Sequence, residues 1–89
     1  MAQVKLIIKG VVQGVFYRDS ARKIALSLNL TGYAKNMPDG TVLSVAIGEK
    51  ENILKYIKWC KQGPEMAKVE NVDIFWINED TKKDTFEIL

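Results

Sequence analysis

The residues of this chain best suited to bind an anion lie in the stretch KGVVQGVFYRD, from Lys9 to Asp19. Gly10 and Gly14 allow backbone conformations that other residues avoid, and they leave no side chain in the way of an approaching ligand. Successive N–H groups of such a loop can point into one concavity, and a helix that begins there adds partial positive charge. Arg18 ends the loop with a planar guanidinium that suits a bidentate contact to phosphate oxygens. The stretch therefore predicts an anion site, with a phosphoryl group as its ligand.

The glycine pattern differs from that of a nucleotide-binding P-loop, because the Gly-Lys-Ser/Thr ending is missing. The alternative to an anion site is a plain connection between a strand and a helix, in which the glycines only allow the turn. In either case we expect the apolar Val12, Val15 and Phe16 to anchor the loop in the core or to line its mouth.

Asn36 is the second candidate for chemistry, and it precedes the turn sequence Pro38–Gly40. An asparagine beside a turn commonly makes a local bond to the backbone, which is the structural alternative for this residue. A carboxamide is too weak a base to remove a proton. It can, however, accept a hydrogen bond from water and hold that water in line with a phosphorus atom.

The composition excludes several kinds of catalysis. The chain has no histidine and a single cysteine, Cys60, so Cys-His pairs, Ser-His pairs and histidine-containing metal sites are ruled out. One cysteine cannot form an intramolecular disulfide, which suits a reducing compartment. Cys60 is in helical register with Ile53 and Ile57, and we expect a buried thiol. A net charge of +2 is too small to argue for a nucleic-acid partner.

Changes in hydrophobic period divide the chain into short elements. Alternation predicts strands over 4–10, 31–37, 41–48 and 69–78, and helical spacing predicts helices over 19–29 and 49–62. Asp19 and Ser20 suit the start of the first helix as caps, and Gly63 followed by Pro64 ends the second. Residues 78–84 are expected to form a polar loop, and residues 85–89 admit a short fifth strand. The expected buried positions are Val4, Leu6, Ile8, Ala21, Ile24, Ala25, Leu28, Ile53, Leu54, Ile57, Cys60, Val72, Ile74 and Trp76.

The order strand, helix, strand, turn, strand, helix, strand repeats one three-element unit. It predicts an α+β fold, a ferredoxin-like split β-α-β sandwich in which two right-handed units interleave. We expect an antiparallel sheet in the order 4-1-3-2 with two helices on one face, in a single domain over residues 1–89. The first and second strands then end at the same edge of the sheet, with the third between them. The glycine loop and Asn36 would face each other there across roughly 9 to 10 Å.

Two segments resemble the signature segments of the acylphosphatase family, IKGVVQGVFYR (Ile8–Arg18) and GYAKNMPDGTVLSVAIG (Gly32–Gly48). Their spacing and the order of the elements also match, so the resemblance covers nearly the whole chain. The matching positions are Gly10, Val12, Gln13, Gly14, Val15 and Arg18 in the first segment, and Gly32, Tyr33, Ala34, Lys35, Asn36, Gly40, Val42 and Gly48 in the second.

The resemblance implies hydrolysis of an acyl phosphate to a carboxylate and inorganic phosphate, with no metal and no cofactor. It implies two catalytic residues, Arg18, which would hold the phosphate, and Asn36, which would orient the attacking water. Backbone amides would complete the phosphate site, those of Gln13, Gly14, Val15, Phe16, Tyr17 and Arg18. Acyl phosphates carry a good leaving group, so the missing histidine is no obstacle, and a phosphate oxygen of the substrate could take the proton of the water.

Tyr17 departs from the family pattern, in which a phenylalanine usually precedes the arginine. The added hydroxyl needs a hydrogen-bond partner or solvent. It casts little doubt on Arg18, but it could change the packing beneath the loop.

Two other functions are compatible with this fold. One is a non-catalytic phosphate-binding module, since acylphosphatase-like domains also occur inside larger proteins. The other is an RNA-binding domain, which needs exposed aromatic residues on its middle strands. The segments 4–10 and 41–48 contain none, and Trp59 and Trp76 are expected to serve in packing. We therefore expect an enzyme that acts on small-molecule acyl phosphates, without a nucleic-acid partner.

The first ten residues, MAQVKLIIKG, contain an apolar run that is too short and too interrupted for a signal peptide or a membrane span. This predicts a cytoplasmic protein with no membrane partner. Nothing in the sequence favours an oligomer, so a monomer is expected.

Overall fold

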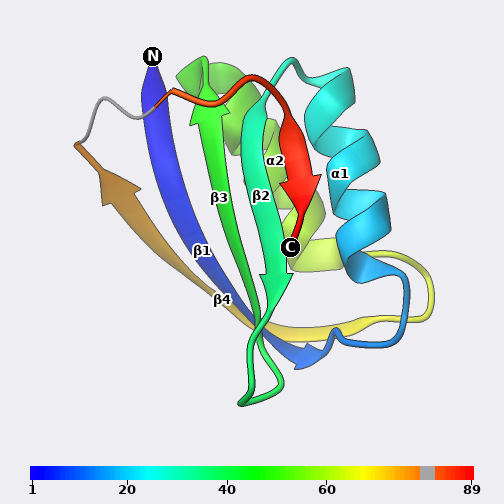
Figure 1. Ribbon diagram of the computed structural model, residues 1–89. Helices are drawn as coiled ribbons and strands as arrows, with labels where there is room; N and C mark the ends of the chain where they lie inside the picture. Colours follow the sequence, from blue (N-terminus) through cyan, green and yellow to red (C-terminus); the bar gives the residue numbers. More distant parts are fainter. Residues whose placement is uncertain (79–81) are drawn as a thin grey trace.

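The computed structural model describes residues 1–78 and 82–89 (Figure 1). Five strands form one sheet in the order β4-β1-β3-β2-β5, and both helices lie on the same face of it. The predicted α+β ferredoxin-like fold and the order 4-1-3-2 are confirmed. The predicted loop over 78–84 lies partly outside the described residues. The elements are β1 (Ala2–Val11), α1 (Tyr17–Ser27), β2 (Thr31–Asn36), β3 (Val42–Gly48), α2 (Lys50–Gln62), β4 (Lys68–Ile77) and β5 (Phe86–Ile88).

The short strand β5 makes the sheet mixed where an antiparallel sheet was predicted. β1 pairs antiparallel with β3 and β4, and β2 pairs antiparallel with β3, but β5 runs parallel to β2. The N–H of Leu89 extends this pairing by donating to the carbonyl of Ala34 at 2.9 Å. A strand of three residues has no periodicity that could indicate its partner. Its position brings the last residues of the chain beside β2 and α1 (Figure 1).

The core lies between the sheet and the two helices. Alternation along β1 buries Val4, Leu6 and Ile8 completely, as predicted. Leu54 was expected in the core but is half exposed, because the buried stripe of α2 recurs at every third or fourth residue and position 54 falls beside it. The helix residues that form the core are Tyr17, Ala21 and Ala25 of α1 and Ile53, Tyr56, Ile57 and Cys60 of α2.

Two expected core residues of β4, Ile74 and Trp76, remain 37 % and 47 % exposed. They alternate toward the helix side as predicted, but β4 is the edge strand and α2 covers it incompletely. None of the helices in the described ranges is long and apolar enough to cross a membrane.

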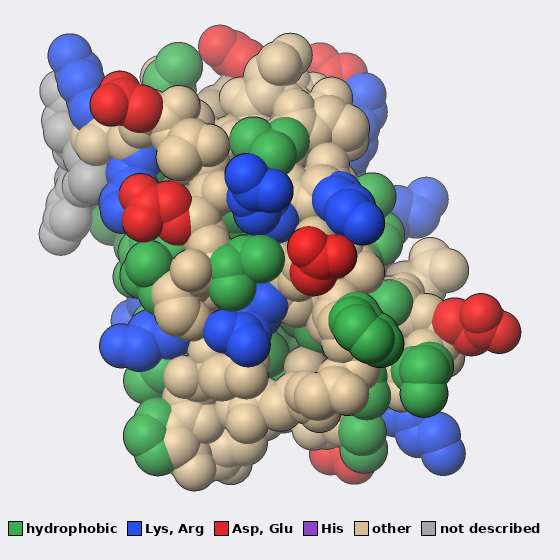
Figure 2. Space-filling model, turned by 45° about the vertical axis from the view of Figure 1, so that its right-hand side comes forward, with side chains coloured by type: hydrophobic (Ala, Val, Ile, Leu, Met, Phe, Trp, Pro, Cys, Tyr) green, Lys and Arg blue, Asp and Glu red, His purple; other side chains and the backbone are tan. Residues whose placement is uncertain are grey.

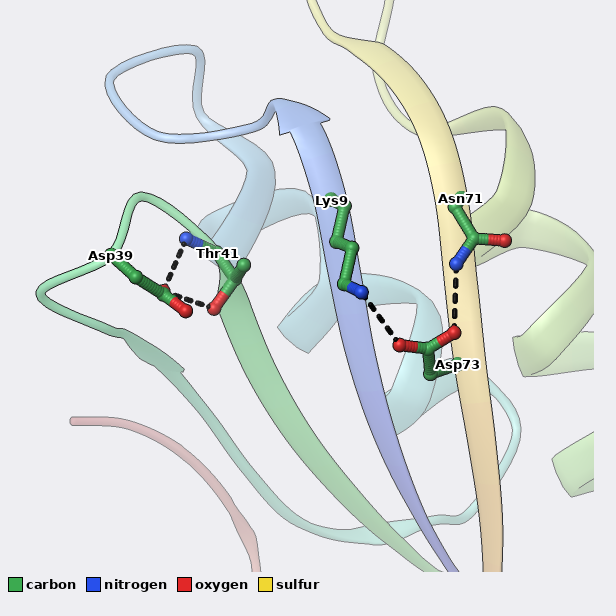
Figure 3. Close-up of polar contacts among 5 residues, drawn as sticks. All are labelled: Lys9, Asp39, Thr41, Asn71 and Asp73. Carbon is green, nitrogen blue, oxygen red and sulfur yellow. Dashed lines mark hydrogen bonds and ion pairs between the residues drawn. The ribbon is translucent and has the colours of Figure 1, made fainter.

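A β-bulge at the end of β1 redirects the chain into the glycine loop. The register between β1 and β4 shifts between Lys9 and Gly10. A Cβ atom at Gly10, whose φ is +126°, would overlap the carbonyl oxygen of Lys68, so only glycine allows this approach. Beside the bulge the Lys9 ammonium contacts the Asp73 carboxylate at 2.9 Å (Figure 3). This pair is solvent-exposed, and such pairs contribute little to stability.

The hydroxyl of Tyr17 finds its partner in the other helix. It donates a hydrogen bond to the carbonyl of Cys60 at 2.8 Å, in the interior. This carbonyl has no donor within α2, because the residue four positions later is Pro64 and lacks an N–H. Burial raises the pKa of Tyr17 far above its ordinary value and raises that of the Cys60 thiol to about 12. Both groups therefore stay protonated, and the bond joins the start of α1 to the end of α2.

We expect Tyr17→Phe to lower the free energy of unfolding by about 1 kcal/mol, because it leaves a buried carbonyl without its donor. Urea unfolding followed by circular dichroism measures the change. Tyr33→Phe is the matched control, since Tyr33 lies on the open face of the sheet and is partly exposed. Equal stabilities of Tyr17→Phe and the wild type would contradict this account.

Candidate active site

The sheet topology brings the glycine loop and Asn36 to one edge, as predicted. β3 lies between β1 and β2, which therefore run in the same direction. Both arrowheads point toward the lower edge in Figure 1, where the loop of residues 12–16 leaves β1 and crosses to α1. Asn36 is the last residue of β2. It lies two residues beyond the fully buried Ala34, so its side chain is on the helix side of the sheet, beneath this loop.

The loop backbone has the alternating conformation that is typical of anion-binding loops. Gly14 has a φ of +73° and Phe16 a φ of +62°, whereas Val15 between them is not among the residues with positive φ. Alternation of this kind turns successive N–H groups toward one side, the arrangement that binds anions in many proteins. A Cβ atom at Gly14 would have no neighbour within 4 Å, so this residue borders open space.

The start of α1 adds further unpaired donors. The helix begins at Tyr17 and not at Asp19, and its N-cap is Phe16, with no capping hydrogen bond from a side chain. The prediction that Asp19 and Ser20 cap the helix is therefore wrong, whereas the expected place of Asp19 in the first helical turn, where its charge complements the helix dipole, is confirmed. Within the described part of the chain, the backbone N–H groups of residues 13–19 donate no hydrogen bond. Of these residues, Gly14, Phe16, Tyr17, Arg18 and Asp19 line one cavity, at the positive end of the helix dipole.

Gln13 ties the loop to the β2–β3 hairpin. Its Nε2 atom donates to the carbonyls of Met37 at 2.8 Å and Thr41 at 2.9 Å. The hairpin is itself fixed by Asp39, whose carboxylate accepts hydrogen bonds from the Thr41 hydroxyl at 2.6 Å and the Thr41 N–H at 3.0 Å (Figure 3). These two bonds lower the pKa of Asp39 below its ordinary value. The distance between the loop and Asn36 is thus set by a chain of hydrogen bonds.

A cavity of about 270 Å³ opens between the loop, α1 and β2. It contains both predicted catalytic residues, Arg18 and Asn36. Of the predicted binding residues, Gln13 and Val15 do not line it. Two lining residues were not expected from the sequence: Asp19, which follows Arg18 in the first turn of α1, and Ile88, because no pattern indicated that β5 pairs with β2. The lining residues are Val12, Gly14, Phe16, Tyr17, Arg18, Asp19, Asn36 and Ile88.

The Asn36 carboxamide has an unsatisfied oxygen. Its Oδ1 atom is buried, and no donor among the described residues reaches it. Buried polar atoms are nearly always paired, because an unpaired one forfeits its hydration. The local bond to the turn that is common for asparagine is not made by this oxygen. The atom can therefore accept a hydrogen bond from a ligand or water when the side chain opens slightly to the cavity.

Arg18 is held from the opposite wall. Its Nη1 atom donates to the carbonyl of Leu89 at 2.9 Å. One turn later, Nε of Arg22 donates to the carbonyl of Phe86 at 3.1 Å, so α1 is tied both to β5 and to the residue that follows it. A guanidinium has five N–H donors, and the bond to Leu89 uses one of them. The others remain for a ligand, and the side chain is already oriented.

Comparison with known proteins gives a consistent answer. The acylphosphatase family model matches residues 4–88. A curated acylphosphatase of Thermus thermophilus is 48 % identical over 79 residues, which are 89 % of this chain and 90 % of the relative. The chain belongs to the acylphosphatase family. The family and its hydrolase activity on acyl phosphates, both expected from the two signature segments, are confirmed.

Solved structures of the family superpose closely on this chain. An acylphosphatase from Bacillus subtilis superposes with a TM-score of 0.97 at 28 % identity, covering 100 % of this chain and 99 % of that one. An acylphosphatase from Coxiella burnetii gives a TM-score of 0.94 at 38 % identity, covering 99 % and 92 %. Both matches extend over nearly the full length of each partner.

We expect Gln13→Leu to loosen the contact between the loop and the hairpin. It removes two hydrogen bonds to carbonyls that also accept a bond from the hairpin backbone, so the free energy of unfolding should fall by about 1 kcal/mol. Amide NMR shifts of residues 36–41 should move with it. Gln62→Leu, at an exposed position at the end of α2, is the control. Unchanged hairpin shifts in Gln13→Leu would refute the tether.

Proposed function

We propose that the cavity between the loop and Asn36 is the site where this acylphosphatase cleaves its substrate. The observation that carries the proposal is the combination of unpaired loop amides, the oriented guanidinium of Arg18 and the donorless Oδ1 of Asn36 around one cavity. Each of these groups complements one part of a phosphoryl group and its attacking water. Together they leave no need for a titrating base.

The phosphoryl group would lie in the concavity of the loop. The backbone N–H groups of residues 13–18 and the free donors of Arg18 would bind its three non-bridging oxygens. The uncapped start of α1 adds partial positive charge at the same point. These donors are fixed before the substrate arrives, so little reorganisation is required as charge develops on the oxygens in the transition state.

Asn36 would position the nucleophile. Its Oδ1 accepts a hydrogen bond from a water molecule and holds the water oxygen in line with phosphorus. The water oxygen forms a bond to phosphorus, the bond between phosphorus and the carboxyl oxygen breaks, and the carboxylate leaves with the electron pair. The proton of the water passes to a non-bridging phosphate oxygen. The products are a carboxylate and inorganic phosphate.

Asp19 is the only carboxylate among the side chains that line the cavity, and it is already paired with a lysine. Its carboxylate contacts the Lys23 ammonium at 3.3 Å, one turn further along α1, and both side chains are more than half exposed. We therefore assign it no proton transfer.

A non-catalytic phosphate-binding module is the second candidate. The loop amides and Arg18 alone would suffice for such a module, whereas the buried, unpaired oxygen of Asn36 would serve no purpose in it. Hydrolysis of benzoyl phosphate in the presence of a chelator, with inorganic phosphate as a competitive inhibitor, distinguishes the two. Phosphate binding without any turnover would support the module.

The remaining parts of the proposal concern the state of the protein. We propose a single-domain monomer in the cytoplasm that acts on small molecules, without membrane or nucleic-acid partners. Support comes from the continuous core between sheet and helices and from the single, buried cysteine. Lysines on the open face of the sheet, such as Lys9 and Lys35, oppose face-to-face association of two copies.

We expect Asn36→Ala to reduce kcat by about 10²- to 10³-fold, the usual effect of removing one well-placed polar group, with little change in KM. Its free energy of unfolding should not fall, because the substitution also removes an unsatisfied buried oxygen. Steady-state kinetics on benzoyl phosphate together with urea unfolding measure both. Near wild-type turnover would remove Asn36 from the mechanism, and a large loss of stability would favour a structural role.

Arg18→Ala should weaken both substrate and product binding, so KM and the inhibition constant of inorganic phosphate rise together. Both constants are measured by steady-state kinetics on benzoyl phosphate, as for Asn36→Ala. Asn36→Ala is the comparison variant for Arg18→Ala. An unchanged phosphate inhibition constant would show that Arg18 does not contact the phosphoryl group.

Gly14→Ala and Gly40→Ala form a matched pair. Both glycines have positive φ, +73° and +92°, and an added Cβ atom meets nothing within 4 Å at either position. Each substitution should cost about 1–2 kcal/mol of stability, because alanine is strained there. Only Gly14→Ala should weaken phosphate binding, since its methyl group would enter the cavity. Equal phosphate affinities in the two variants, measured by NMR titration, would refute the loop as the phosphate site.

A further inference from the structure

The short strand β5 contributes to the cavity wall through Ile88, yet it pairs with one strand alone. It is the outermost strand of the sheet, beside β2, and α1 lies along its other edge (Figure 1). A strand of three residues makes few backbone hydrogen bonds. The position of β5 therefore depends on the contacts that α1 supplies.

The helix α1 contacts this part of the chain with two arginines, Arg18 and Arg22, which lie one turn apart on the same face. Figure 2 brings this side of the molecule forward and shows basic side chains over the middle of the face. Arg18 donates to the carbonyl of Leu89, the residue after β5, at 2.9 Å. Arg22 donates through Nε to the carbonyl of Phe86 at 3.1 Å. Of the two arginines, Arg18 lines the cavity and Arg22 does not.

The carbonyl of Phe86 lies on the edge of β5 that faces away from β2. The preceding carbonyl, that of Thr85, accepts the N–H of Gly32 at 3.0 Å, and successive carbonyls of a strand point to opposite edges. The hydrogen bond from Arg22 thus supplies a donor to the unpaired edge of β5 and joins it to α1. Phe86 is completely buried, so the acceptor of this bond is fixed by the core.

The charge of Arg22 offers a different way to affect the cavity. Its guanidinium forms no ion pair with the described residues, and the Asp19 carboxylate on the same helix contacts Lys23 at 3.3 Å. Asp19 and Lys23 therefore offset each other beside the cavity, whereas Arg22 leaves a positive charge one turn from Arg18. A through-space attraction of phosphate by this charge must be separated from an effect of the hydrogen bond to Phe86.

We propose that Arg22 is a positioning residue for Arg18 and acts through β5. Its hydrogen bond to Phe86 holds β5 against α1, and β5 in turn places the carbonyl of Leu89 where it orients the Arg18 guanidinium. A long side chain loses conformational entropy when a ligand orders it, so an arginine that is oriented in advance binds phosphate more tightly. The inference rests on the proposed function, because the orientation matters only if Arg18 binds the phosphoryl group.

Two substitutions of Arg22 separate the hydrogen bond from the charge. Arg22→Gln places an amide nitrogen as many bonds from the backbone as Nε of arginine, so it keeps a donor for Phe86 without the charge. Arg22→Met has a methyl group at that place and loses both the donor and the charge.

Arg22→Met should raise KM for benzoyl phosphate and the inhibition constant of inorganic phosphate together, by about twofold to tenfold, the fold-change that corresponds to one hydrogen bond. Its kcat should stay unchanged, because Arg18 and Asn36 are still present. Arg22→Gln should stay close to the wild type in both constants. Equal increases in the two variants would show that the charge of Arg22 is responsible and would overturn the positioning role.

A double substitution asks whether Arg22 acts through Arg18. When Arg22→Met is added to Arg18→Ala, the inhibition constant of phosphate should not rise further, because no guanidinium remains to be oriented. A further increase of the same size as in the wild-type background would refute the coupling. Lys55→Met, at an exposed position of α2, is the control for the loss of one positive charge and should leave both constants unchanged.

The same measurements separate this inference from the mechanism. If Arg18→Ala leaves the inhibition constant of phosphate unchanged, the proposed function is refuted, because Arg18 then does not contact the phosphoryl group. If Arg18→Ala weakens phosphate binding and Arg22→Met does not, the positioning role alone is refuted. Amide NMR shifts of residues 86–89 follow β5 directly, and they should move in Arg22→Met and stay in place in Arg22→Gln.

Discussion

The position of β3 between β1 and β2 is the constraint on which the rest of this structure depends. Two strand–helix–strand units interleave, so β1 and β2, which follow each other along the chain but are not adjacent in the sheet, end at the same edge. One strand delivers a loop of backbone donors there, and the other delivers a carboxamide. The hairpin that makes this interleaving possible also accepts the two hydrogen bonds of Gln13. The same local connection therefore sets both the topology and the width of the cavity.

Several groups around the cavity are unfavourable for folding and favourable for binding. The loop amides are unpaired, the oxygen of Asn36 lacks a donor, and Phe16 is strained and exposed. The stability of a domain of this size is only a small difference between large terms, so such features must be offset elsewhere. The completely buried alternation of β1 and the bond between Tyr17 and Cys60, close to the loop, supply part of that compensation.

The sequence was sufficient to predict the fold, the strand order and the edge where Arg18 and Asn36 lie, because these follow from strong periodicities and from glycines with a clear backbone role. It was insufficient where the outcome depends on single contacts. The start of α1 was placed two residues late, since the strained conformation of Phe16 leaves no trace in composition. The pairing of β5 with β2 depends on backbone hydrogen bonds, which no side-chain pattern predicts. The position of Ile88 beside the cavity follows from this pairing and was therefore not predicted either. Tyr56 was not among the expected buried positions, yet it is buried and shares a 2.8 Å hydrogen bond with Ser44.

The buried thiol of Cys60 has a consequence for how the molecule opens. It is completely inaccessible, and its pKa of about 12 keeps the reactive thiolate rare at neutral pH. An alkylating reagent can reach it only when α2 separates from the sheet, a motion that disrupts the whole core. The rate at which the Cys60 sulfur is alkylated therefore measures how often the core opens cooperatively. No cysteine has to be introduced for this measurement.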